Sequence, residues 1–167
     1  MKKTVLAILM AITLTLSLAL SVSAEQTPDG NAPVVDEDGN TTYYYEDGSY
    51  TVISAVEKVE TAMTRAATKT TAGKVSAINY TSDGEQNWIY TLIGHFTYEE
   101  GVSCVCTNST YTTSITGSGW KFYDPSNTWS DNAAYGYGVF KHKVLFITNN
   151  TVTVDLRIRC DSYGNFY

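Results

Sequence analysis

The chain contains little of what several functional classes require. Its 167 residues include only two His, three Cys and three Pro, and charged residues make up 17%. Lys and Arg total 11 against 17 Asp and Glu, a net charge of −6, so there is no surplus of positive charge for binding nucleic acid phosphates. Three Pro and 12 Gly are too few for a collagen-like or low-complexity chain, and a hydrophobic content of 43% excludes wholesale disorder. Length and composition together predict one modest globular domain.

The N-terminal segment has the layout of a secretory signal peptide. Residues 1–3 (MKK) are basic, an apolar run follows from Thr4 to about Leu20, and residues 22–24 (VSA) supply the small side chains of a cleavage site. The apolar run is nearly long enough to cross a bilayer, but the small residues and the acidic segment after them favour cleavage. We therefore expect residues 1–24 to be removed and residues 25–167 to be secreted, with no membrane association after cleavage.

Charge and turn-forming residues divide the expected mature chain into an arm and a body. Residues 25–50 hold seven acidic residues and no Lys or Arg, whereas residues 51–167 hold nine basic and ten acidic residues. Repeated Asp-Gly pairs in the arm favour turns, and a small hairpin there would be only marginally stable alone. Residues 56–72 are rich in Ala and Thr and fit a helical face loosely, which indicates a linker with at most a short helix. We assign residues 25–73 to a flexible, acidic, Tyr-containing arm and a Thr/Ala-rich linker.

Residues 74–167 show the alternation of half-buried β-strands. The run from Val152 to Ile158 alternates apolar and polar residues and is the clearest period-two pattern in the chain. The run from Trp88 to Tyr98 alternates in the same way. Turn-forming clusters separate such runs, with no confident helix between them. We predict an all-β fold, an antiparallel sandwich of about six or seven strands that is immunoglobulin-like or similar.

Three cysteines in a secreted chain predict one disulfide. Cys104 and Cys106 are two residues apart on an expected strand, so they face the same side and are too close to bridge each other comfortably. One of them therefore pairs with Cys160, which closes a loop of more than fifty residues and contributes on the order of 4 kcal/mol through loop entropy. The residues alone do not select between the two partners. A metal site built from the cysteines and a His is the alternative, but the spacing fits no standard zinc pattern.

Five short motifs occur in order along the chain: Glu46–Val52 (EDGSYTV), Gly94–Tyr98 (GHFTY), Cys106-Thr107, Trp120-Lys121 and Arg159–Asn165 (RCDSYGN). Together with the signal peptide they resemble a family of small secreted proteins from Gram-positive Firmicutes, marked by a G-x-F-T-Y strand and a closing C-x-x-x-G-N motif, that carries only an uncharacterised-domain label. The resemblance covers residues 46–165 and implies an extracellular location and a β fold, but no activity. The family has one Cys beside the Thr, which corresponds to Cys106. The resemblance therefore implies a Cys106–Cys160 disulfide and leaves Cys104 as a free thiol.

Residues that could carry catalysis are scarce. His95 lies on the polar side of its expected strand and His142 lies between two lysines, as surface histidines do. The G-x-S-x-G elbow of hydrolases is absent, as are the fingerprints of metalloproteases, phosphate loops and dinucleotide sites. Residues 36–40 (DEDGN) faintly resemble a calcium loop but lack the rest of the ligand series. We expect no enzymatic activity, no cofactor and no metal.

Aromatic residues beside Gly, Asn or Asp are the remaining functional candidates. Trp129, Tyr135 and Tyr137 have such neighbours, a setting that suits sugar stacking or a protein interface. Tyr and Trp are also ordinary strand residues, and we assign Trp88 and Trp120 to the core. We predict a non-catalytic extracellular binding module for a glycan or a protein. The alternatives are a secreted antagonistic, bacteriocin-like factor, against which the acidic chain argues, and an uncharacterised hydrolase.

Overall fold

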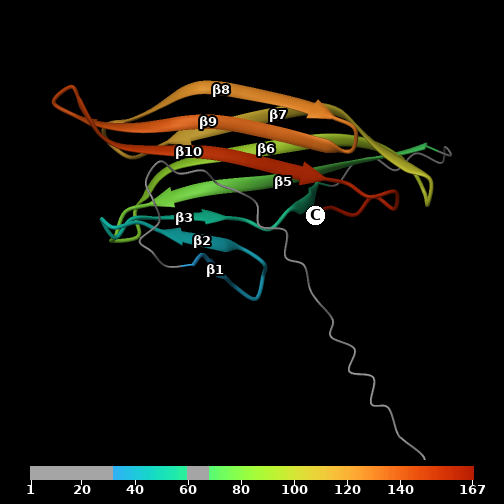
Figure 1. The fold of residues 1–167 in the computed structure, drawn as a ribbon, viewed down its shortest axis with the longest axis horizontal. Helices are drawn as coiled ribbons and strands as arrows, with labels where there is room; N and C mark the ends of the chain where they lie inside the picture. The colour runs from blue at the N-terminus through green and yellow to red at the C-terminus, as the bar shows by residue number, and fades with distance from the viewer. Residues whose placement is uncertain (1–31, 60–67) are drawn as a thin grey trace, which may run out of the picture.

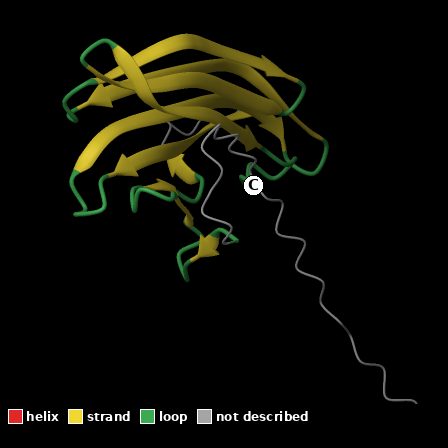
Figure 2. Ribbon diagram, turned by 60° about the vertical axis from the view of Figure 1, so that its left-hand side comes forward, coloured by secondary structure: helices red, strands yellow, loops and turns green. Residues whose placement is uncertain are grey.

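The computed structural model of the chain describes residues 32–59 and 68–167, and within these residues the fold is all-β, without a helix. Two antiparallel sheets pack face to face (Figures 1 and 2). The seven-stranded sheet has the order β1-β2-β3-β5-β6-β7, with β4 paired to β5, and the three-stranded sheet has the order β10-β9-β8. The strands are β1 (Val34–Val35), β2 (Thr41–Tyr44), β3 (Tyr50–Ile53), β4 (Glu57–Val59), β5 (Thr68–Tyr80), β6 (Gln86–Glu99), β7 (Ser103–Ile115), β8 (Trp120–Ser130), β9 (Ala133–Val144) and β10 (Ile147–Arg159).

The core between the two sheets follows the predicted alternation. Every second residue of β10 from Val152 to Ile158 is fully buried, as is every second residue of β6 from Trp88 to Leu92. The Trp88 ring from β6 stacks on Phe140 from β9, with centroids 3.9 Å apart and planes 3° from parallel. The prediction of an all-β antiparallel sandwich is confirmed, and Trp88 is a core residue as expected.

The expected flexible arm contributes strands to the larger sheet. Residues 41–53 form the β2–β3 hairpin, and β3 pairs with β5 so that Tyr50 lies opposite Tyr80. The rings of these two tyrosines stack with centroids 5.0 Å apart, and Thr51 and Ile53 are buried. A hairpin that is marginal alone is thus stabilised by adding to an existing sheet edge.

The expected linker is also partly strand. β5 begins at Thr68, before the predicted start of the body at residue 74, and its first residues pair with the end of β6. Residues 60–67, where the sequence allows a short helix, lie outside the described residues, as does the expected signal peptide at residues 1–24.

Four five-residue turns share one hydrogen-bond pattern. The first residue donates its N–H to the carbonyl of the fifth, and a Gly at the fourth position donates to the carbonyl of the first. Each Gly has a φ between +78° and +82°, a region that side-chain-bearing residues avoid. Asp36 and Asp161 open two of the turns, and hydrogen bonds from Asn40 and Asn165 respectively lower the pKa of their carboxyl groups. The Asp36 carboxylate therefore accepts from N–H groups of its own turn. This turn explains why residues 36–40 resemble a calcium loop in sequence. The four turns are residues 36–40, 45–49, 81–85 and 161–165.

Candidate functional site

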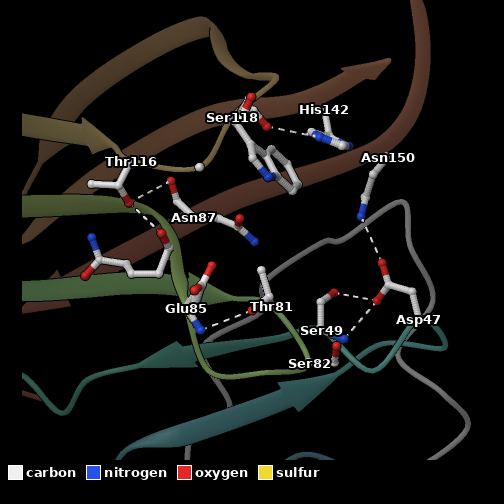
Figure 3. Close-up of a pocket in the computed structure, with 13 residues that line it drawn as sticks. Asp47, Ser49, Thr81, Ser82, Glu85, Asn87, Thr116, Ser118, His142 and Asn150 are labelled. Atoms are coloured by element: carbon white, nitrogen blue, oxygen red, sulfur yellow. Dashed lines mark hydrogen bonds between the residues drawn. The ribbon is translucent and has the colours of Figure 1, made fainter.

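A polar pocket opens at one end of the sandwich, where three turns meet strands β9 and β10 (Figure 3). Its volume is about 440 Å³. The turns after β2, β5 and β7 each contribute side chains, and His142 and Asn150 come from β9 and β10. Hydroxyl, amide and carboxylate groups dominate the lining, and Trp120 is its one large aromatic residue. The pocket is thus a concave polar site with one aromatic ring.

A chain of buried hydrogen bonds fixes the floor of this pocket. The Tyr45 hydroxyl donates to Thr51 Oγ1 at 3.0 Å, and Asn79 Nδ2 donates to the same oxygen at 3.1 Å. Asn79 Oδ1 in turn accepts from Asn87 Nδ2 at 2.8 Å. Asn87 lines the pocket, whereas Asn79 is only 1% exposed. The chain therefore links the β2–β3 hairpin through β5 to the position of the Asn87 side chain.

Replacing Asn79 by Ala is expected to lower the free energy of unfolding by about 2–3 kcal/mol. The substitution leaves the buried side-chain amide of Asn87 without its hydrogen-bond acceptor and removes the hydrogen bond to Thr51 Oγ1. Urea denaturation followed by circular dichroism measures the change. The matched control is Thr112→Ala on the exposed face of β7, for which we expect a change within about 0.5 kcal/mol. A loss below about 1 kcal/mol at Asn79 would contradict the proposed coupling.

The β7–β8 loop lies against the pocket so closely that two of its positions require Gly. A Cβ on Gly117 would come 2.5 Å from Asn87 Oδ1, and one on Gly119 would come 2.8 Å from His142 Nε2. Gly119 also has a φ of +80°. The N–H groups of Thr116 and Gly117 donate to the Asn87 carbonyl at 2.9 and 2.8 Å. This loop is therefore held in one conformation over the pocket.

His142, the imidazole of this pocket, has contacts at both ring nitrogens. Nε2 donates to the Ser118 carbonyl at 3.1 Å, and Nδ1 lies 2.8 Å from Asn149 Oδ1. The ring lies 5.3 Å from the Trp120 ring. Because neither nitrogen is open to the pocket, His142 holds the loop and the Trp120 ring in place and is not arranged as a general base.

The polar groups of the pocket differ in how accessible they are to a ligand. Asn150 Oδ1 is buried with no hydrogen-bond partner among the described residues, while its Nδ2 donates to Asp47 Oδ2 at 3.4 Å. Asp47 Oδ1 accepts from the Ser49 N–H at 2.9 Å. The side chains of Ser82 and Glu85, both exposed, make no hydrogen bond to another described residue. Ser82 and Glu85, both in the turn between β5 and β6, are therefore the accessible groups of this set.

The aromatic residues named by the sequence do not form one surface. Tyr135 and Tyr137 lie on the outer face of β9, where Tyr137 borders a depression of about 330 Å³. Trp129 on β8 lies opposite Ala134, so it shares the inner face of that sheet although it is 45% exposed. The residue that sequence reasoning placed only in the core, Trp120, both packs against that core and lines the pocket. Its place beside the Gly117–Gly119 turn is the sequence signal that would have identified it.

The three cysteines gather at the opposite end of β7 and β10 from the pocket. Cys104 and Cys160 lie within hydrogen-bonding reach of each other, whereas the Cys106 thiol donates to the Asn108 carbonyl at 3.4 Å. The three thiols are unbonded and near one another. Burial raises the pKa of all three, so they remain largely protonated at neutral pH and are weak nucleophiles.

Metal and membrane features are not found in the part of the chain that the structure describes. Within residues 32–59 and 68–167, no group of three or more His, Cys, Asp or Glu side chains gathers where a metal ion could be held. The same residues include no helix long and apolar enough to cross a bilayer.

Comparison with known proteins leaves the pocket as the main guide to function. No protein-family model, no curated protein and no solved structure matches the chain.

Proposed function

We propose that this protein is a secreted, non-catalytic binding module and that its polar pocket holds a glycan. The observation that carries the proposal is the meeting of Trp120 with the exposed side chains of Ser82 and Glu85 in one concave site of about 440 Å³. Sugars present flat C–H faces that pack on an aromatic ring and hydroxyls that need donors and acceptors at fixed positions. The volume lies within the ordinary range of small-ligand sites and suits a short oligosaccharide end better than a protein surface.

Three arrangements support binding rather than hydrolysis. His142 has both nitrogens engaged by Ser118 and Asn149. Asp47 accepts hydrogen bonds from Ser49 of its own turn and from Asn150 of β10, so its carboxylate is already engaged by the protein. The buried thiols have raised pKa values and lie at the far end of the strands. A hydrolase would need a positioned nucleophile or an acid–base pair.

The proposal also places the protein outside the cell. The basic, apolar and small-residue segments of residues 1–24 have the order of a signal peptide. In an oxidising compartment we propose a disulfide between Cys104 and Cys160, since these two thiols face each other. Both thiols give up their protons and two electrons in total to a disulfide oxidant, which leaves as two thiols. The motif resemblance would instead pair Cys106 with Cys160.

The glycan proposal is tested by co-sedimentation with insoluble peptidoglycan and by binding to immobilised mucin. We expect the protein to be retained on at least one of these materials at moderate salt. Trp120→Ala is expected to weaken retention by about tenfold, as the loss of one ring stack predicts. Glu85→Ala, which removes an exposed pocket group without touching the core, should weaken retention while the fold stays intact.

Two further variants control for the other aromatic surfaces. Trp129→Ala removes an equally large ring outside the pocket, and Tyr137→Ala removes one from the outer face of β9; both should bind as the unaltered protein does. Retention that falls with Tyr137→Ala but not with Glu85→Ala would move the site to the outer face. Failure to bind either material would overturn the glycan assignment.

A further inference from the structure

The turn between β9 and β10 exposes four consecutive apolar residues. Val144, Leu145, Phe146 and Ile147 are 49, 85, 99 and 71% exposed. Val144 pairs with Ile147, so the hairpin is closed by a two-residue loop of Leu145 and Phe146. No described residue covers this tip. A contiguous exposed apolar cluster indicates a contact surface, whereas single scattered apolar residues are ordinary on protein surfaces.

The backbone of the tip strengthens this interpretation. Leu145 and Phe146 have φ values of +47° and +71°, in the left-handed region that two-residue hairpin loops require. Asn-Gly and Asp-Gly are the usual residues in such loops, because large side chains are strained there. The two most exposed large apolar side chains among residues 32–59 and 68–167 thus lie where they destabilise the hairpin. A strained conformation with unfavourable residues points to a functional requirement.

Behind the tip lies a cluster of lysines on the outer face of the smaller sheet. Lys121 on β8 lies directly opposite Lys141 on β9, and Lys143 lies two residues closer to the tip. None of the three forms an ion pair with a described carboxylate. Lys141 and Lys143 instead approach the Tyr123 ring, at 5.2 and 5.4 Å from its centroid. Like charges directly opposite each other destabilise a sheet, so this cluster also favours an external anionic partner.

The acidic groups of this end lie away from the tip. On the same face Asp155 is opposite Tyr137, four residue pairs further from the tip than Lys141. Asp124 and Asp155 line the depression of about 330 Å³ on this face together with Lys141. Asp47 and Glu85 belong to the turns of the other sheet and line the pocket, and the same two turns also carry the exposed Glu46 and Asp83. The net charge of the expected mature chain, which argues against a membrane partner, comes mainly from residues 25–50. Residues 51–167 carry nine basic and ten acidic residues, so the lysine cluster is a local feature.

We propose that the β9–β10 tip docks the protein on an anionic lipid bilayer. A β-strand rises about 3.3 Å per residue. Along β9, Lys143 therefore lies about 7 Å and Lys141 about 13 Å further from the tip than Leu145. Apolar side chains that enter the headgroup region reach depths of about 5–10 Å. Leu145 and Phe146 therefore enter the acyl boundary while the lysine side chains reach the lipid phosphates. A few apolar residues or a few lysines alone bind weakly, and the two together give stable attachment.

The order of residues favours lipid over an apolar groove on a protein. From the tip inward the outer face presents apolar side chains, then three ammonium groups, then the Tyr123 ring. The first two layers match the depth order of acyl chains and lipid phosphates, and the Tyr123 ring contacts the lysines from the side away from the bilayer. A groove on a partner protein would account for the apolar tip but not for the unpaired lysines behind it.

The experiment is sedimentation of the purified protein with vesicles of phosphatidylcholine alone or mixed with phosphatidylglycerol. We expect binding to the mixed vesicles, at least tenfold weaker binding to phosphatidylcholine alone, and loss of the difference at high salt. The variant Leu145→Asn/Phe146→Gly installs the preferred turn residues, so its fold should be at least as stable. It should bind the mixed vesicles at least tenfold more weakly.

Two more variants separate the contributions. Lys141→Gln/Lys143→Gln should reduce binding to the mixed vesicles and leave any weak binding to phosphatidylcholine unchanged. Val102→Ser removes an apolar residue that is 69% exposed in the β6–β7 turn and should bind normally. Equal binding by Leu145→Asn/Phe146→Gly and by the unaltered protein would overturn the proposal. So would no binding to the mixed vesicles, which would leave the tip as a protein-docking surface.

Discussion

Replacing Trp88 by Ala is expected to lower the free energy of unfolding by about 3–5 kcal/mol. Trp88 is fully buried, stacks on Phe140 of the opposite sheet, and meets Trp120 edge-on with centroids 6.2 Å apart. The substitution opens a cavity between the two sheets and removes ring contacts on both sides. A domain of this kind has a total stability of about 5–15 kcal/mol, so the variant should be largely unfolded at modest urea concentrations.

A more conservative change at the same position is expected to be far milder. Trp88 Nε1 is buried without a hydrogen-bond partner among the described residues, and an unpaired buried N–H is destabilising by about 1–3 kcal/mol. Trp88→Phe keeps a ring stacked on Phe140 and removes this N–H. The destabilisation from the smaller ring and the stabilisation from removing an unpaired N–H should offset each other, so that the free energy of unfolding changes by no more than about 1 kcal/mol.

Circular dichroism in urea is the appropriate measurement, because removing a Trp changes the fluorescence signal directly. Trp129→Ala is the matched control, since that ring is 45% exposed on the edge strand β8; its expected change is below about 1 kcal/mol. If Trp88→Ala were no more destabilising than this control, the face-to-face packing of β6 on β9 would be wrong.

The sequence was sufficient to predict those strands of the sandwich that have one face buried and the other exposed to solvent. The run from Val152 to Ile158 alternates cleanly, and the structure buries its apolar members. The sequence allowed a small hairpin in the arm, but its pairing with the larger sheet was beyond this reasoning because its strands have four residues each. Its buried positions include Thr51, whose partner is Asn79. A buried polar pair has no hydrophobic signature in sequence, and its partner is 28 residues away.

The candidate site was less predictable than the fold. Each turn around the pocket could be recognised from its Gly, but the meeting of three turns depends on the order of strands in two sheets. Trp120 was assigned to the core because a Trp on a strand is usually buried, whereas its place as the first residue of β8 also brings it into the pocket lining. The apolar tip at Leu145 and Phe146 was not predicted either. Residues 144–147 contain no Gly, Asn, Asp or Pro, so in sequence this turn resembles the middle of an apolar strand.

Formation of one disulfide is expected to raise the free energy of unfolding by an amount on the order of 4 kcal/mol over the reduced protein. The bond between Cys104 and Cys160 would close a loop of more than fifty residues and so restrict the unfolded chain. Urea unfolding of the oxidised and reduced protein measures the difference, and intact mass under non-reducing conditions shows whether two hydrogens have been lost.

Single Ser variants then decide which cysteine pairs with Cys160. Cys104→Ser should abolish the bond and reproduce the stability of the reduced protein. Cys106→Ser should keep it and lose little stability, because a Ser hydroxyl can still donate to the Asn108 carbonyl that accepts from Cys106. The reverse pattern would support the motif resemblance over the thiol geometry. It would also require the start of β7 to shift relative to the end of β10. Cys104 and Cys106 face the same side of β7, and Cys104 is the one that lies next to Cys160.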